Sequence, residues 1–136
     1  MGDSVIKIIS ATSGQGTAFQ PDIPGYNPGE ALPAQQNDVV SWKNLTDDTH
    51  QPWPTEPWPT DPSEPIQPLS EADVLPRGSA NYLSDPIPPG EPSTPAYVVQ
   101  QPSTAPDEWI VYYYCKLHPD NEAERGTINA TIPPTY

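Results

Sequence analysis

Short apolar runs alternate with polar, proline-containing stretches along the chain, and no segment repeats apolar residues at helical spacing over several turns. Six segments are short and rich in β-branched or aromatic residues, as strands are. We expect these strands at Ser4 to Ala11, Ala31 to Gln35, Asp38 to Lys43, Ala96 to Gln100, Trp109 to Cys115 and Gly126 to Ile132. Alternate side chains of the last two would face the core of a sandwich. The pattern therefore predicts an all-β protein.

The segment 51–106 differs from the rest because prolines come every few residues and apolar residues become sparse. Ladder hydrogen bonds are hard to maintain there, so we interpret it as a long, stiff insertion or loop region. It contains a tandem repeat, PWPTE followed by PWPTD, centred on Trp53 and Trp58, which we expect to form polyproline II. The two indoles could form a docking surface or a lid, but packing onto the sandwich is the simpler interpretation.

Length and charge restrict the classes of function. A chain of 136 residues is the size of one domain and can bury a core without disulfides. Its 18 carboxylates outnumber its 5 Lys and Arg side chains, and the net charge of −13 disfavours binding to nucleic acids or anionic membranes. A basic protein partner would be attracted, although scattered acids also serve solubility. No apolar run approaches the roughly 20 residues that span a bilayer, and the N-terminal residues lack the apolar core of a signal peptide.

Residues with metal-binding chemistry are concentrated in the stretch WIVYYYCKLHPD, where a predicted strand ends at Cys115 and His118 follows after two residues. This spacing at a strand-to-loop turn can direct a thiolate and an imidazole to one point. Both groups suit copper, and a third nitrogen ligand would complete a trigonal site. The only other histidine of the sequence is His50, after the segment DVVSWKNLTDDT. The C-x-x-H spacing alone is weak evidence, because a lone cysteine is more often an inert buried residue.

Several segments, in order, resemble the cupredoxins, the small blue copper proteins of the plastocyanin, amicyanin and halocyanin type. DVVSWKN resembles the family's strand before its first histidine ligand, and His50 stands where that ligand is expected. IPPG, with Pro89 and Gly90, resembles the proline-glycine turn, and IVYYYCKLHP resembles the strand that leads to the cysteine and the second histidine. ERGTINATI resembles the closing segment of amicyanin. The ordered match covers about half of the chain.

The resemblance implies a Greek-key β-sandwich that binds one copper ion per chain through His50, Cys115 and His118. We expect residues 1–136 to form a single domain of this type, with 51–106 as its proline-rich insertion. The implied function is electron transfer by the Cu(II)/Cu(I) couple with a redox partner protein that has a basic docking surface, and not enzymatic catalysis. The resemblance also implies a periplasmic or other extracytoplasmic location.

The sequence departs from the family at the axial copper ligand. The family's usual methionine lies two residues before the glycine of the closing segment, where this chain has Glu124 before Gly126, and its only methionine is Met1. A carboxylate in that position would favour Cu(II) over Cu(I), lower the reduction potential and distort a trigonal site. The resulting ligand set resembles that of the red copper protein nitrosocyanin. The alternatives are Asp120, Glu122, a backbone carbonyl or water.

Side chains next to the ligands are expected to orient them. Gln51 follows His50 where the family often has an asparagine that links the two ligand loops by hydrogen bonds, and Asn44 is a second candidate. The three tyrosines before the cysteine, 112–114, are expected to pack in the core rather than to relay electrons.

Two other classes of function stay open. A copper site with an open coordination position beside Glu124 could bind small molecules for redox chemistry or sensing. A metal-free interaction module could instead use the sandwich as a scaffold and the PWPT repeat as its binding face. Titration of the copper spectrum with azide or nitrite, and direct measurement of copper binding, discriminate between these hypotheses.

Overall fold

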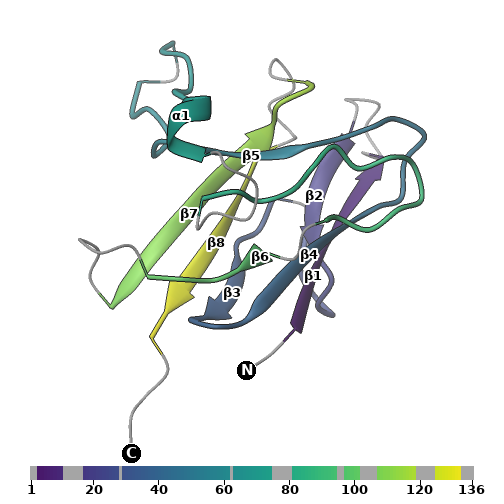
Figure 1. Cartoon of the computed structure of the whole chain (residues 1–136), viewed down its shortest axis with the longest axis horizontal. Helices are drawn as coiled ribbons and strands as arrows, with labels where there is room; N and C mark the ends of the chain where they lie inside the picture. Colours follow the sequence, from purple (N-terminus) through teal and green to yellow (C-terminus); the bar gives the residue numbers. More distant parts are fainter. Residues whose placement is uncertain are drawn as a thin grey trace, which may run out of the picture.

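The computed structural model describes residues 3–10, 17–27, 29–61, 63–74, 81–94, 97–101, 107–118 and 125–132. These residues are almost entirely strands and connecting loops (Figure 1). In chain order the elements are β1 (Asp3–Ser10), β2 (Thr17–Pro21), β3 (Leu32–Gln35), β4 (Val39–Asn44), β5 (Pro52–Thr55), α1 (Glu71–Val74), β6 (Tyr97–Val98), β7 (Glu108–Cys115) and β8 (Arg125–Thr131). Within the described ranges no helix has the length and hydropathy needed to cross a bilayer.

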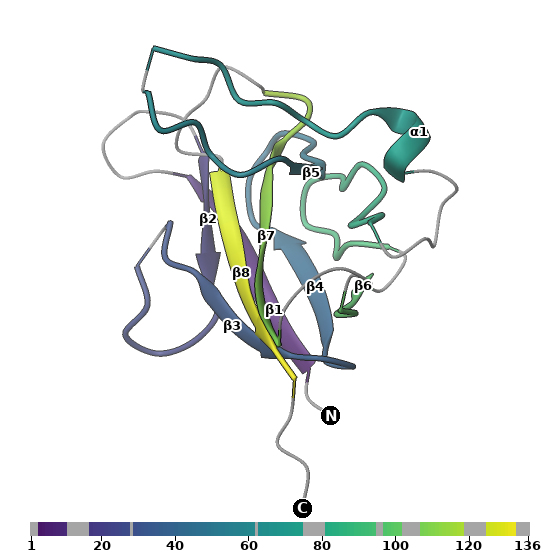
Figure 2. The same ribbon diagram turned by 90° about the vertical axis from the view of Figure 1, so that its left-hand side faces the viewer.

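The strands form two four-stranded sheets, ordered β2-β1-β4-β6 and β3-β8-β7-β5. Both sheets are mixed, because β1 pairs with β4 and β3 pairs with β8 in parallel while the remaining pairs are antiparallel. In Figure 2 the strands β7 and β8 lie in front of β1 and β4, and side chains from both sheets share one buried core. The prediction of an all-β sandwich is confirmed.

The alternation of buried and exposed side chains along the strands shows where the core lies. Every second residue of β4 and of β8 is buried, as expected for strands with one face toward a partner sheet. At the centre the ring of Tyr113 lies 5.5 Å from that of Trp42 and 4.9 Å from that of Phe19, both in edge-on arrangements. Fully burying an aliphatic side chain stabilises a fold by about 1.5–3 kcal/mol. The main-core residues with 1% exposure or less are Ile6, Ile8, Phe19, Leu32, Val40, Trp42, Ile87, Val99, Cys115, Ile128 and Ala130.

The six predicted strands correspond to β1, β3, β4, β6, β7 and β8, although the segment Ala96 to Gln100 contains only the short strand β6. Strands β2 and β5 were not predicted. The interpretation of the first PWPT repeat as polyproline II is wrong, because residues 52–55 form β5 and pair with β7. The backbone N–H of Lys116 donates to the carbonyl oxygen of Gln51 at 2.9 Å. The backbone N–H and C=O groups of the odd-numbered residues of β5 therefore point toward β7, and the proline nitrogens at positions 52 and 54 point away from it.

The proline-rich region forms a second, smaller cluster on the outer face of β7. Four buried side chains make it up: Trp53, Val74, Tyr82 and Tyr114. The indole N–H of Trp53 donates to the carbonyl oxygen of Leu69 at 2.8 Å. The ring of Trp58 meets that of Tyr112 edge-on at 5.2 Å. Both tryptophans of the repeat thus pack on the sandwich, in agreement with the simpler of the two interpretations.

Candidate metal centre

Two chain segments far apart in the sequence meet where β7 ends. Cys115 is the last residue of β7, and the antiparallel register places Pro52 of β5 opposite it. His50 lies two residues before Pro52 and is therefore brought to the same end of the sheet. His118 comes from the turn after Cys115, where its backbone N–H donates to the Cys115 carbonyl oxygen at 3.1 Å.

The donor atoms of His50, Cys115 and His118 all lie within 4.8 Å of one another. The Cys115 sulfur is 3.7 Å from Nδ1 of His50 and 3.3 Å from Nδ1 of His118. Metal–sulfur and metal–nitrogen bonds of about 2.3 and 2.0–2.1 Å, set at tetrahedral to trigonal angles, separate the two donors by about 3.5–3.8 Å. The sulfur–nitrogen distance to His50 lies in this range, and the distance to His118 is slightly shorter. The donor set therefore fits one transition-metal ion, and its mixture of thiolate and imidazole suits copper.

The backbone of His50 is fixed by an isolated β-bridge to Ile87, which lies outside the named strands. Its N–H donates to the carbonyl oxygen of Ile87 at 3.2 Å, and the Ile87 N–H donates back at 2.7 Å. The following turn is held at Gly90, whose N–H donates to the carbonyl oxygen of Asn44 at 2.9 Å. Gly90 has φ of +78°, a left-handed conformation that glycine adopts without a steric penalty. The Pro-Gly turn seen in the sequence thus holds the loop that carries His50.

The orientation of the Asn44 side chain follows from its partners. Its amide nitrogen donates to the carbonyl oxygens of Asp48 at 2.6 Å and Ile87 at 2.9 Å. Its amide oxygen accepts the backbone N–H of Thr46 at 2.9 Å and the Thr46 hydroxyl at 2.7 Å. Since a buried amide needs both donor and acceptor partners, only this orientation satisfies the group.

The Thr46 hydroxyl selects the tautomer of His50. Thr46 Oγ1 lies 2.7 Å from Nε2 of His50, and its single proton is directed to an oxygen of Asn44 or Asp48. The hydroxyl oxygen therefore accepts the N–H of Nε2, which leaves the lone pair on Nδ1, the atom that faces Cys115. A neutral imidazole with this tautomer is ready to bind a metal ion. Sequence analysis missed Thr46, although a threonine two residues after an asparagine at a strand end is typical of a polar turn.

The two imidazoles differ in exposure. His50 and Cys115 are both fully buried, whereas His118 is half-buried and its neighbour Leu117 is 45% exposed. The surface approach to the site thus lies on the side of His118.

Two of the residues predicted to orient the ligands differ in their roles. Asn44 does order the loop before His50, as described above. Gln51 uses its side chain to donate to the carbonyl oxygen of Ser84 at 3.1 Å, so only its backbone oxygen contacts the cysteine loop, through Lys116. The prediction that the Gln51 side chain links the two ligand loops is wrong for this reason.

The side chains that pack with Cys115 in the core are largely apolar and aromatic. Burial raises the pKa of Tyr113, and burial together with repulsion from the Cys115 thiolate raises the pKa of Tyr114. Both phenols therefore stay neutral near pH 7. The ammonium of Lys116 lies 3.8 Å from the ring centre of Trp53 and 3.3 Å from a Glu71 carboxylate oxygen.

Glu124, the predicted axial ligand, lies outside the described residues, as do its alternatives Asp120 and Glu122. Its place in the site stays a prediction from the sequence.

Comparison with solved structures identifies the fold. A purple cupredoxin from Nitrosopumilus maritimus matches with a TM-score of 0.51 and 19% sequence identity, over 95% of this chain and 100% of its own. The chain has the cupredoxin fold. A laccase-like multicopper oxidase, CueO from Ochrobactrum sp., matches with a TM-score of 0.51 and 14% identity over 96% of this chain, which spans 27% of the oxidase.

At these identities the likeness concerns the fold, and the whole oxidase is far longer than this chain. No family model and no curated protein sequence matches the chain. In the cupredoxin fold described here, the His50, Cys115 and His118 group is compatible with a copper site.

Proposed function

We propose that this protein is a mononuclear copper protein that transfers electrons, with copper held by His50, Cys115 and His118 and with Glu124 as the axial ligand. The observation that carries the proposal is the convergence of one thiolate and two imidazoles within 4.8 Å at the end of β7 in a cupredoxin fold. Bound copper would supply a one-electron couple between Cu(II) and Cu(I).

The chain's own residues favour a rigid site. Thr46 sets the tautomer of His50, the Ile87 backbone pair fixes its position, and full burial of Cys115 excludes water from the sulfur. Donors that keep one geometry in both oxidation states suit electron transfer better than catalysis. The half-exposed imidazole of His118 is the ligand that a partner protein could approach.

Glu124 enters the proposal through the sequence alone, from its position two residues before Gly126. An anionic oxygen ligand would stabilise Cu(II) and lower the reduction potential. We propose a single ion per chain, and one domain spanning 1–136 with 51–106 as its insertion. We also propose an extracytoplasmic location.

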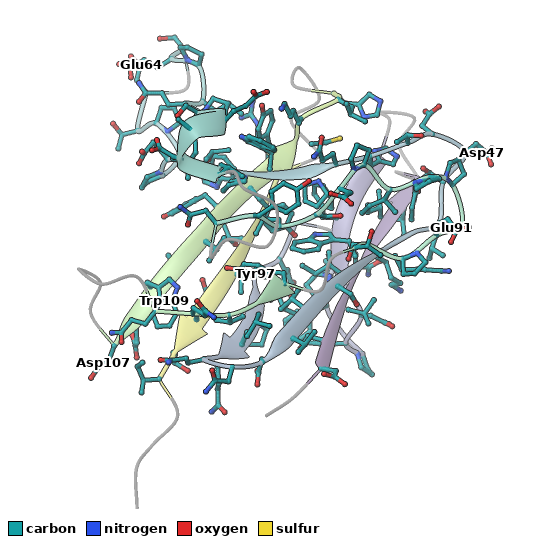
Figure 3. All side chains as sticks on the ribbon, in the orientation of Figure 1. Asp47, Glu64, Glu91, Tyr97, Asp107 and Trp109 are labelled. Carbon is teal, nitrogen blue, oxygen red and sulfur yellow. The ribbon has the colours of Figure 1, made fainter. Side chains whose placement is uncertain are left out.

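The charge of the chain bears on the redox partner. Asp47 and Glu91, labelled in Figure 3, lie on loops at the end of the molecule where β4 ends. With a net charge of −13, the protein would attract a basic docking surface at low ionic strength.

Optical and electron paramagnetic resonance spectra of the copper-loaded protein test the ligand set. We expect an intense thiolate-to-copper absorption that disappears in Cys115→Ser and in the zinc-loaded protein. A visible band that survives in Cys115→Ser would exclude the cysteine as a ligand.

A matched pair of variants tests the axial position. Glu124→Met should raise the reduction potential and shift the absorption, whereas Glu122→Met, two residues away in the same segment, should change neither. If the Glu122 variant responds and the Glu124 variant does not, the axial assignment moves to Glu122.

Addition of azide or nitrite separates electron transfer from chemistry at an open coordination position. A saturated site leaves the copper spectrum unchanged at millimolar anion. A new charge-transfer band would instead support binding of small molecules at the metal.

A further inference from the structure

A groove of about 510 Å³ lies beside the first half of β7, away from the metal centre. Its walls include Thr55 and Glu56 at the end of β5, Tyr97 of β6, and Trp109 and Ile110 of β7. Figure 3 labels Trp109 near the beginning of β7, just after Asp107, and Tyr97 on β6. Ile110 precedes Cys115 by five residues, which corresponds to about 17 Å along a strand.

Two backbone hydrogen bonds, one at each end of β7, show toward which neighbouring strand the N–H and C=O groups of each β7 residue point. The N–H of Ile132, just after β8, donates to the carbonyl oxygen of Asp107 at 3.0 Å. The backbone N–H and C=O groups of the odd-numbered residues of β7 therefore point toward β8. The hydrogen bond from the Lys116 N–H to the Gln51 carbonyl oxygen shows that the backbone groups of the even-numbered residues point toward β5. The last pair of β5 with β7 joins Thr55 and Tyr112.

Two even-numbered residues of β7, Glu108 and Ile110, therefore direct their backbone N–H and C=O groups past the end of β5, on the edge where Ile110 lines the groove. Among the residues that the structure describes, these groups make no hydrogen bond on that side. Ile110 is also 47% exposed.

The neighbouring edge of the same sheet is protected. Pro52 and Pro54 have no N–H to present on the outer edge of β5. That edge is also covered, because the N–H of Leu69 donates to the carbonyl oxygen of Pro54 at 3.0 Å and the N–H of Glu56 donates to that of Gln67 at 2.9 Å. Proteins usually block or cover strand edges in this way. Within the described ranges, neither a proline nor a backbone hydrogen bond protects the open edge of β7 at residues 108 and 110.

The charge around the groove indicates the chemistry of an occupant. Glu56 is the one charged residue among the described lining residues, and the exposed Asp107 and Glu108 directly precede the lining residue Trp109 in the chain. We infer that this groove binds an extended, basic segment of a partner protein, which adds as an antiparallel strand to residues 108–111 and continues the direction of β5. The inference does not depend on copper binding.

A synthetic peptide with alternating Lys and Val, acetylated and amidated at its ends, is the probe. In the full chain, saturating peptide should slow hydrogen exchange of the Ile110 amide at least tenfold. A peptide N-methylated at alternate residues, which cannot donate to β7, should bind at least tenfold more weakly. Equal binding of the two peptides, or unchanged exchange at Ile110, would overturn the inference.

Variants of the chain locate the binding. Ile110→Pro removes the outward N–H without removing a bond of the sheet and should weaken peptide binding at least tenfold. Glu108→Gln should weaken it several-fold, whereas Asp47→Asn, at the other end of the molecule in Figure 3, should not. If Ile110→Pro does not fold, the N-methylated peptide on the unaltered chain still decides the question. If the Ile110 amide became protected without peptide as the protein concentration rises, the edge would pair with a second copy of the chain. That result would overturn the inference of a basic partner segment.

Discussion

Strand β7 is covered on its two faces by different parts of the chain. Toward the inside, Tyr113 and Cys115 pack in the sandwich core with Trp42. Toward the outside, Tyr114 packs with Trp53 in the cluster that the proline-rich region forms. The end of β7 that carries the thiolate is thus buried on both faces, while its beginning at Glu108 is exposed.

The two faces of β7 are therefore covered in different ways. The inner face is built by strands that pair along their length and belongs to the sandwich itself. The outer face depends on a four-residue strand and a loop held by single contacts such as the bond between Trp53 and Leu69. If the outer cluster contributes to stability, the proline-rich region is part of the folded unit and not an appended loop.

The strongest test of this comparison is Trp53→Ala. Removal of a buried indole costs about 3–5 kcal/mol of unfolding free energy, because the surrounding groups fill the cavity only partly. We expect a loss comparable with that of Trp42→Ala in the main core, measured by urea denaturation. Trp53→Phe, which keeps an aromatic ring, should retain much of the stability. A loss below about 1 kcal/mol would show that the outer cluster does not stabilise the fold.

Alkaline denaturation tests the inner face. Burial raises the pKa of Tyr97 to about 12 and also raises that of Tyr113. In the unfolded chain both phenols ionise near pH 10. Between about pH 10 and 12 the unfolded state thus binds fewer protons, so the stability present below pH 10 falls as the pH rises, by about 2 to 3 kcal/mol for Tyr97 at pH 12.

Tyr97→Phe should therefore make the loss of stability between about pH 10 and 12 shallower. Val98→Ala, one residue along, keeps the phenol and should preserve the slope. The measurement is the urea midpoint at pH 9, 10, 11 and 12. Identical slopes for the Tyr97 variant and the unaltered chain would show that Tyr97 is not protected from ionisation in the folded state.

The elements that the sequence predicted are those with one buried face. Alternate burial in β4 and β8 leaves a period of two that is visible in VVSWKN and GTINAT. β5 is buried at all four positions and contains two prolines, so it has neither the period nor the composition of a typical strand. Its pairing depends on proline nitrogens that point away from β7, and that register is set by tertiary contacts.

The candidate site shows a similar division. His50, Cys115 and His118 could be predicted because they are the only residues of their types in the chain. Asn44 was also predicted, but its hydrogen bonds with Thr46 were not, since they arise from the conformation of the turn before His50. The groove at Ile110 also escaped prediction, because it is formed by segments distant in the sequence. Glu124 remains a prediction.

A smaller effect is expected where the inner face is most tightly packed. Tyr113 lies opposite Gly126 on β8, and its ring occupies the space where a side chain at Gly126 would stand. Gly126→Ala forces the ring to move and should cost about 1–3 kcal/mol. Asn129→Ala on the exposed side of β8 is the control. In a Tyr113→Ala background the cost of Gly126→Ala should largely vanish, and a cost that persists would contradict this packing.

Thr46→Val tests the support of the site itself, at the smallest expected cost. The variant keeps the shape of the side chain but leaves the His50 Nε2 proton and one acceptor site of Asn44 unpaired, at a cost of about 1 to 2 kcal/mol. Thr46→Ser keeps the hydroxyl and should behave like the unaltered chain. In the copper-loaded protein the loss of tautomer selection should lower copper affinity by about 10- to 100-fold. Nitrogen chemical shifts of His50 in the metal-free protein report the tautomer directly: a proton that stays on Nε2 in Thr46→Val would show that another group, and not this hydroxyl, prepares the imidazole for the metal.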